Sequence, residues 1–218
     1  SNQEAGEIYA SFEICGMMER TPTGIVKIGY DNISYNDNFD SKKNWSIMIS
    51  EAEKQAEISN EKLVKLRGII DNSVGYMENV YANPDLFVGH ELPLPYDTVD
   101  GVACSKYMLA KDVVDSEEIQ AHVRILSNCD YLFGPQLENN TMMDNLYLGT
   151  QDGIYYRYSR ANSYNPDYDP RQRGWYVAAL ETEGAVWMDT YTDFYGKLCL
   201  TCARKFKGPD GEVRGVLS

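Results

Sequence analysis

The sequence predicts an α+β fold in which one long N-terminal helix packs on an antiparallel sheet. Residues 41–83 carry apolar side chains at steps of three and four, which is the period of a helix with one buried face. After Pro84 the chain changes to short apolar segments broken by turns, with few helical segments between them. The 218 residues, 43 % of them hydrophobic, are enough to form a real core.

The helix over 41–83 is predicted from its apolar stripe and from its two ends. Ser41 is a candidate N-cap, and the helix should end before Pro84 because proline pushes the preceding residue out of helical geometry. About 40 residues rising ~1.5 Å each give a rod of roughly 60 Å, a length that suits a spine next to a membrane. The alternative is a coiled-coil or bundle helix, which Gly68 and Gly75 disfavour. The stripe consists of Trp45, Met48, Ala52, Ala56, Leu63, Leu66, Ile70, Val74, Met77 and Tyr81.

The segments after Pro84 predict one further helix and several strands. Residues 116–129 have a helical pattern, and residues 207–211, Lys-Gly-Pro-Asp-Gly, have the composition of a hairpin turn. Residues 1–40 have no function that the sequence assigns. The expected strands are 101–107, 146–148, 153–158, 186–188, 197–203 and 213–217.

The charge of the chain argues against nucleic acid and anionic lipid as partners. Lysine and arginine number 20 and aspartate and glutamate 33, which gives a formal charge of -13 at pH 7. No apolar run approaches the ~18 residues of a membrane span. If the parent protein is a membrane protein, we therefore expect its anchors outside these residues.

Metal binding and catalysis are both disfavoured by the residue types present. Cys199 and Cys202 have a spacing seen in zinc sites, but positions three apart on a strand face opposite sides, and no second pair accompanies them. The only histidines, His90 and His122, have no plausible nucleophile beside them. We therefore expect no metal, no cofactor and no catalysis, and we interpret the five scattered cysteines as free thiols. They are Cys15, Cys104, Cys129, Cys199 and Cys202.

The richest segment for chemistry is 164–195, where tyrosines and tryptophans surround two arginines. A zwitterionic amino acid needs a planar cation for its carboxylate and acceptors for its ammonium group, and arginine, tyrosine, tryptophan and aspartate supply both. The alternative is that Trp175 and Tyr176 are only core aromatics at a helix start, with Arg171 and Arg173 solvated. The residues alone leave both readings open.

The nonapeptide Tyr-Asp-Pro-Arg-Gln-Arg-Gly-Trp-Tyr at 168–176, followed by Trp-Met-Asp-Thr-Tyr-Thr-Asp at 187–193, resembles the ligand-pocket signature of double Cache sensor domains. Residues 149–155 resemble the strand and turn that enter that pocket, and 208–216 its closing hairpin. The resemblance covers residue 41 to the end and implies a PAS-like (Cache) sheet.

Within that family the resemblance is to the subset that binds amino acids, and it implies a role for individual positions. Tyr168, Arg173 and Trp175 match the residues that hold the ligand carboxylate. Tyr176 and Tyr191 match the tyrosines that line the ammonium side.

Three further positions belong to this comparison with the family. Asp193 lies where some members have a second acidic contact, and the essential aspartate of the family is expected about two residues after Ser218. Gly174 stands where the family usually has proline, which loosens the turn without removing a contact.

Taken together, the resemblance implies the extracytoplasmic sensor domain of a bacterial transmembrane receptor, recognising a free α-amino acid and having no enzymatic activity of its own. The expected parts are an unassigned segment (1–40), the spine helix (41–83) and a membrane-distal Cache module (84–218), with homodimerisation through the long helix possible. The alternatives are the same fold binding another small carboxylate or amine, or a structural or dimerisation domain without a ligand. The output domain, whether kinase, chemotaxis transducer, diguanylate cyclase or serine phosphatase, is not determined by these residues.

Overall fold

The computed structural model describes residues 8–10, 26–28, 41–92, 104–159, 167–192 and 198–218. The chain divides into two compact units, Ser1–Lys65 and Leu66–Ser218. In the first unit, strands β1 (Ile8–Ala10) and β2 (Val26–Ile28) pair antiparallel, with Ile8 opposite Ile28. The second unit contains the sheet and the candidate site.

Helix α1 runs without a break over Ser41–Ala82, which confirms the helix predicted from the apolar stripe. Its C-terminal part buries one side chain per turn, at Ile70, Val74 and Met77, and these belong to the main hydrophobic core. The helix continues through Gly68, where an added Cβ would meet nothing within 4 Å. Among the helices of the described residues, none is long and apolar enough to cross a membrane.

The second unit is built on a six-stranded antiparallel sheet of order β3-β5-β4-β10-β9-β6. Each strand pairs antiparallel with its neighbours, so the predicted fold class is confirmed. A separate two-stranded sheet joins β7 and β8. The strands are β3 (Cys104–Leu109), β4 (Asn145–Thr150), β5 (Ile154–Ser159), β6 (Val186–Trp187), β7 (Tyr191–Thr192), β8 (Leu198–Cys199), β9 (Cys202–Lys207) and β10 (Val213–Leu217).

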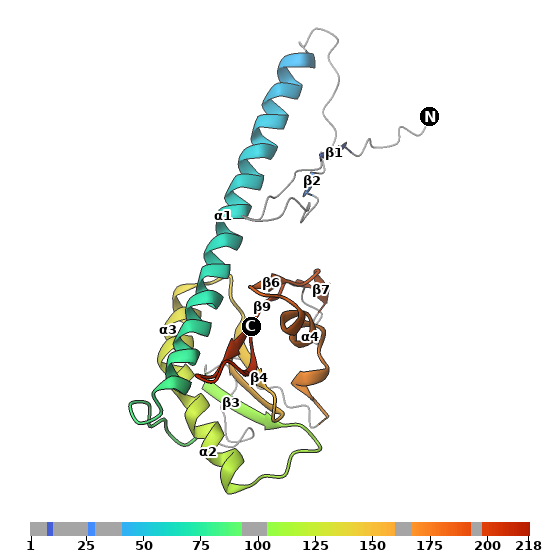
Figure 1. The fold of residues 1–218 in the computed structure, drawn as a ribbon. Coiled ribbons are helices and arrows are strands. Elements are labelled where there is room, and N and C mark those ends of the chain that lie inside the picture. Colours follow the sequence, from blue (N-terminus) through green and yellow to red (C-terminus); the bar gives the residue numbers. More distant parts are fainter. Residues whose placement is uncertain (1–7, 11–25, 29–40, 93–103, 160–166, 193–197) are drawn as a thin grey trace. The chain divides into compact units, whose positions relative to one another are not determined.

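The helices of the second unit cover both faces of this sheet (Figure 1). Helix α2 (Glu117–Leu126) is capped by Ser116, whose side chain accepts a hydrogen bond from the backbone N–H of Ile119 at 3.3 Å. A 3₁₀ turn (Ser127–Cys129) joins it to α3 (Asp130–Asn139), which was not predicted because it contains Gly134 and Pro135. On the other face lies the short helix α4 (Gly174–Glu181).

Successive side chains of β5 point to opposite faces of the sheet. Ile154 and Tyr156 are fully buried in the core formed with α1, α2 and α3. Tyr155 points the other way, into a second cluster with Trp175 and Tyr176 of α4. The candidate site therefore belongs to the face of the sheet that carries α4.

One prediction about the strands is wrong. Cys199 and Cys202 do not lie on one strand, because the segment 197–203 is interrupted: Cys199 belongs to β8 and Cys202 begins β9. Cys202 is buried opposite Trp187 of β6, and burial raises the pKa of its thiol to about 12. The predicted hairpin at 207–211 is confirmed, with Gly211 at φ +82 and its N–H donating to the carbonyl of Gly208 at 3.0 Å.

A hydrogen-bonded chain ties the end of α1 to the β4–β5 turn. The Tyr81 hydroxyl contacts Nε2 of His122, whose Nδ1 lies 2.5 Å from Oδ2 of Asp152, and the Thr150 hydroxyl donates to the same carboxylate. Burial raises the pKa of Asp152, but the hydrogen bonds from His122 and Thr150 outweigh it, and the net effect is a lowered pKa.

The Asp152 contact is expected to make stability depend on acid pH. Because its folded-state pKa is lower than the unfolded value, Asp152 stabilises the protein above pH about 4, and this contribution is lost as pH falls through the folded pKa. Asp152→Asn should therefore lower the midpoint of urea unfolding at pH 7 and reduce the loss of stability between pH 5 and 3. Unfolding curves for both proteins at each pH measure this, and parallel pH profiles would contradict it.

Candidate functional site

The motif at 168–176 forms a turn that leads directly into α4. The carboxylate of Asp169 accepts a hydrogen bond from the backbone N–H of Arg171 at 2.9 Å and so begins a 3₁₀ turn over Pro170–Gln172. The turn lies against β4 at Gly149, where an added Cβ would be 2.5 Å from Cβ of Pro170. Glycine at this position lets the turn approach the sheet closely enough to bring the following side chains over it.

Two aromatic rings of the sheet and three of the motif meet below this turn. Tyr147 of β4 and Tyr155 of β5 are neighbours at 5.8 Å between ring centroids. Tyr155 contacts Tyr168 at 4.5 Å, and Tyr147 contacts Trp175 edge-on at 5.1 Å. Trp175 is also 5.6 Å from Tyr176. Tyr147 and Tyr155 therefore form an aromatic floor on the sheet, beneath the segment that carries the motif.

Arg173 lies beside this floor with its cation on an aromatic ring. Its Cζ is 4.2 Å from the centroid of Tyr168, within the range of a cation–π contact. The Nε atom is buried, and among the described residues no acceptor reaches it. Buried donors are nearly always hydrogen-bonded in folded proteins, so Nε of Arg173 is available to an acceptor that the described residues do not supply.

Tyr176 presents a second buried polar atom of the same kind. The residue is 3 % exposed, and no described group forms a hydrogen bond with its hydroxyl. Burial raises the pKa of Tyr176 to about 12, so the hydroxyl is neutral at physiological pH and can both donate and accept. If the Tyr176 side chain served only as part of the core, its buried hydroxyl would stay without a hydrogen-bond partner, which costs about 1–3 kcal/mol of stability.

Among the predicted site residues that the structure describes, Tyr191 is the most exposed, at 44 %. Its hydroxyl lies 3.1 Å from Oγ1 of the buried Thr201, and the Tyr147 hydroxyl lies 3.4 Å from the same atom. Thr201 therefore connects Tyr191 to the aromatic floor. Asp193, predicted as an acidic contact, lies outside the described residues.

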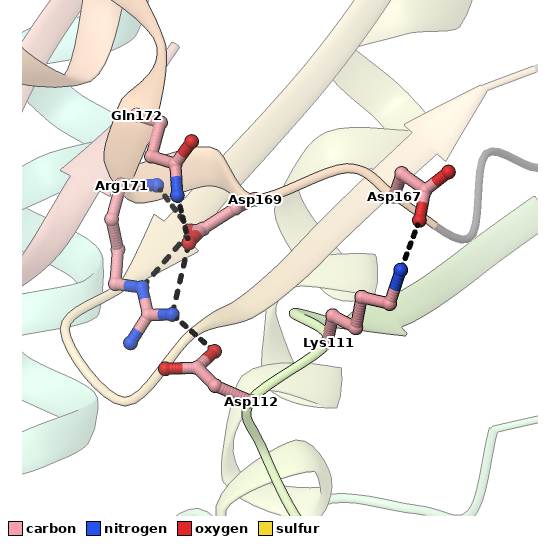
Figure 2. Close-up of a pocket in the computed structure, with 6 residues that line it drawn as sticks. All are labelled: Lys111, Asp112, Asp167, Asp169, Arg171 and Gln172. Atoms are coloured by element: carbon pink, nitrogen blue, oxygen red, sulfur yellow. Dashed lines mark hydrogen bonds and ion pairs between the residues drawn. The ribbon is translucent and has the colours of Figure 1, made fainter.

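Arg171 forms ion pairs with two carboxylates, so its side chain is not simply solvated. Its side chain binds the carboxylate of Asp169 through Nε and Nη2, both at 2.9 Å, and Nη2 also lies 2.5 Å from Asp112. The hydrogen bond to Arg171 is the main cause that lowers the pKa of Asp169. Figure 2 shows these groups around a surface cavity of about 580 Å³, which Lys111, Asp167 and Gln172 complete.

The two arginines of the motif thus have different environments. Arg171 is held by two carboxylates, whereas Arg173 has an aromatic ring and a buried N–H without a described acceptor. Within the described residues, no cluster of three or more histidine, cysteine, aspartate or glutamate side chains is placed to hold a metal ion. Chemically, the site offers a planar cation, neutral hydroxyls and aromatic rings.

The structure brings Tyr168, Arg173, Trp175 and Tyr176 together and adds three residues that the sequence did not single out. These are Tyr147, Tyr155 and Thr201. Tyr147 lies on β4 and Tyr155 on β5, the two strands joined by the turn within 149–155, and no local pattern in the sequence identifies the face to which they point.

Comparison with known proteins gives partial structural similarities. No family model and no curated protein matches the sequence. The ligand-binding domain of the Pseudomonas fluorescens chemoreceptor CtaA, in complex with L-alanine, matches with 17 % identity and a TM-score of 0.49, over 79 % of this chain and 56 % of that chain. That of the Campylobacter jejuni chemoreceptor Tlp3, in complex with L-norvaline, matches with 16 % identity and a TM-score of 0.44, over 84 % and 61 %.

A third match is shorter. The ligand-binding domain of the Pseudomonas aeruginosa amino acid chemoreceptor PctB, in complex with L-Arg, is 31 % identical over 38 % of this chain and 34 % of that chain, with a TM-score of 0.33. In all three cases the chain covers less than two thirds of the matching chain. These three solved structures are ligand-binding domains of chemoreceptors, each in complex with an amino acid.

Proposed function

We propose that the second unit of this chain binds a free α-amino acid on the face of its sheet that carries α4, and that the chain is the extracytoplasmic sensor domain of a bacterial membrane receptor. The observation that supports this most is Arg173, a cation stacked on Tyr168 with a buried N–H directed at no described acceptor. The proposal is for binding alone, with no chemistry performed on the ligand.

The carboxylate of the ligand belongs at Arg173. A guanidinium forms paired, charge-assisted hydrogen bonds with a carboxylate, and its planar shape fixes the orientation of the ligand. Stacking on Tyr168 holds the guanidinium in place before the ligand arrives, which lowers the entropic cost of binding. Trp175, 8 % exposed and next to the floor tyrosines, provides apolar surface beside the carboxylate.

The ammonium group belongs on the side of Tyr176 and Tyr191. The buried hydroxyl of Tyr176 can accept a hydrogen bond from an ammonium donor, and this would satisfy the polar atom that the described residues leave without a partner. Tyr191 supplies a second hydroxyl, placed by its contact with Thr201. We propose that Asp193 adds an acidic contact to this side.

Ligand occupancy would be passed on through α1, since its C-terminal part belongs to the core on the opposite face of the same sheet. In a purely structural domain that binds no ligand, the buried polar atoms of Tyr176 and Arg173 would stay without hydrogen-bond partners. A binding screen therefore distinguishes the two possibilities, because a purely structural domain would respond to no amino acid.

A thermal-shift screen of the twenty amino acids is expected to give stabilisation with at least one of them. At a hundred times the dissociation constant, a ligand stabilises the folded state by about 2.7 kcal/mol, or roughly 5–10 °C for a domain of this size. The active amino acid should lose its effect both as its carboxamide, which lacks the carboxylate, and as its N-acetyl derivative, which lacks the ammonium group.

These two derivatives are matched controls for the two halves of the site. If the carboxamide raised the melting temperature as much as the free amino acid, the role proposed for Arg173 would be wrong. If the N-acetyl derivative did so, the ligand would be a small carboxylate that need not carry an ammonium group. No shift with any of the twenty would contradict the proposed function and favour a structural domain.

A further inference from the structure

A line of hydroxyl groups leads from Tyr191 into the sheet. Thr201 lies between β8 and β9 and is 7 % exposed, and its Oγ1 atom is 3.1 Å from the Tyr191 hydroxyl and 3.4 Å from that of Tyr147. The carbonyl of Thr201 accepts the backbone N–H of Met188 at 2.8 Å, so the backbone holds the residue in place. One buried side chain thus joins a tyrosine on the ligand side to a tyrosine of the aromatic floor.

The inner end of this line is next to Ser218. Tyr147 and Ser218 exchange two backbone hydrogen bonds, at 2.8 and 2.7 Å, so their side chains are neighbours on one face of the sheet. Ser218 is 6 % exposed, and its hydroxyl donates to the backbone carbonyl of Cys202 at 3.0 Å. Burial raises the pKa of Tyr147, and hydrogen bonds with the hydroxyls of Ser218 and Thr201 only partly offset this, so Tyr147 keeps its proton.

The carbonyl of Cys202 sets the direction in which these hydroxyls donate. A carbonyl oxygen only accepts, so the single proton of the Ser218 hydroxyl goes to Cys202, and the Ser218 oxygen is left to accept from Tyr147. Tyr147 then accepts from Thr201, and Thr201 accepts from Tyr191. In this order each hydroxyl donates its one proton inward. Reversing the two bonds of Thr201 would leave the oxygens of Tyr147 and Ser218 facing each other with no proton between them.

We propose that Thr201 makes the site selective for an ammonium group over a hydroxyl group on the α-carbon of the ligand. With its proton donated to Thr201, the Tyr191 oxygen can only accept, and an ammonium group, which only donates, is the matching partner. An α-hydroxy acid has one uncharged donor and brings lone pairs toward the same oxygen. Thr201 acts through Tyr191 and is therefore a positioning residue. This inference rests on the proposed function and adds to it the residue that discriminates between two classes of ligand.

Calorimetric titration with an amino acid and with the α-hydroxy acid of the same side chain measures this selectivity. The probes are the amino acid with the largest thermal shift and its hydroxy counterpart, such as L-alanine with L-lactate or L-phenylalanine with L-3-phenyllactate. The amino acid is expected to bind at least about a hundredfold more tightly, because a charge-assisted hydrogen bond is replaced by a mismatched neutral one. A hydroxy acid that bound as tightly as the amino acid would overturn the inference.

Variants then assign the selectivity to Thr201. Thr201→Val keeps the shape of the side chain and removes the hydroxyl, so the Tyr191 proton loses its acceptor and can be offered to a ligand. The ratio of amino-acid to hydroxy-acid affinity should fall about tenfold or more, and Thr201→Ser should keep it within about threefold of the wild type. Thr182→Val is the matched control, because the Thr182 hydroxyl donates to the carbonyl of Ala178 in α4, outside this line, and its loss should leave the ratio unchanged.

The outcomes separate this inference from the proposed function. If Thr201→Val changed the ratio no more than Thr182→Val, or if Thr201→Ser lost selectivity as well, the inference would be wrong and amino-acid binding would stand. If Thr201→Val did not fold, Ser218→Ala would decide, because it removes the acceptor of the Tyr147 proton and with it the reason for the order of donation. Its ratio should fall about threefold or more, and an unchanged ratio would overturn the inference. A wild-type protein that bound none of the twenty amino acids would contradict the proposed function itself.

Discussion

Replacement of Arg173 by alanine is expected to weaken amino-acid binding by more than about thirtyfold. Truncating one partner of a desolvated, hydrogen-bonded charge pair typically costs on the order of 2–5 kcal/mol, and about 2 kcal/mol corresponds to thirtyfold in the dissociation constant. The buried Nε and the stacked position on Tyr168 place Arg173 in such an environment. Calorimetry with the amino acid that gives the largest thermal shift measures the loss.

Arg171 provides the matched control, two residues away in the same motif. Its ion pairs with Asp169 and Asp112 hold the turn before α4, so Arg171→Ala should lower thermal stability and reduce affinity by less than about fivefold. Arg173→Lys, which keeps the charge and loses the planar fork, should lie between wild type and Arg173→Ala. If Arg171→Ala abolished binding while Arg173→Ala left it intact, the assignment of the pocket would be wrong.

The elements that could be predicted from the sequence are those specified by local patterns. The stripe of α1 repeats often enough to fix both its length and its buried side, and its end is set by Pro84. Ser116 caps α2 through its own hydroxyl, and Gly211 supplies the positive φ of the β9–β10 turn. Each of these signals depends on residues close together in the chain.

Elements that depend on tertiary context could not be predicted in the same way. Helix α3 contains Gly134 and Pro135, which disfavour a helix locally, yet Phe133 and Leu137 are buried in the core and hold it in place. The segment that contains Cys199 also looked like a continuous strand. Its division into β8 and β9 follows from pairing with β7 and with the main sheet, which are partners that a local pattern does not reveal.

The candidate site shows the same division. Tyr168, Arg173, Trp175 and Tyr176 lie in one contiguous motif, so a local resemblance is enough to find them. Residues 154–159 of β5, Ile-Tyr-Tyr-Arg-Tyr-Ser, have aromatic side chains on both faces, so no alternation of polar and apolar residues identifies the face of Tyr155 or Arg157. Only the structure shows which of these tyrosines join the site.

The second large expected effect is a loss of stability, and it comes from replacing Asp130 on the opposite face of the sheet. Asp130, the first residue of α3, accepts hydrogen bonds from the hydroxyls of Ser105 and Tyr156 and lies 3.0 Å from Nε2 of His90. Ser105 is 3 % exposed and Tyr156 is fully buried. The single carboxylate thus satisfies two buried donors, from β3 and β5, and joins them to the helical layer.

Asp130→Ala is therefore expected to lower the free energy of unfolding by about 2–6 kcal/mol, since each buried hydroxyl left without an acceptor costs about 1–3 kcal/mol. Glu138→Ala, an exposed carboxylate on the same helix, should change stability by less than about 0.5 kcal/mol. Urea unfolding of both variants measures these values.

A double-mutant cycle with Tyr156→Phe separates the hydrogen bond from the other effects of losing Asp130. Tyr156→Phe removes one of the two donors, so Asp130→Ala should cost about 1–3 kcal/mol less in that background than in the wild type. The coupling arises because a phenylalanine ring has no hydroxyl to leave unsatisfied when the carboxylate is gone. If the two substitutions were additive to within about 0.5 kcal/mol, the carboxylate would not be the group that makes burial of the Tyr156 hydroxyl tolerable.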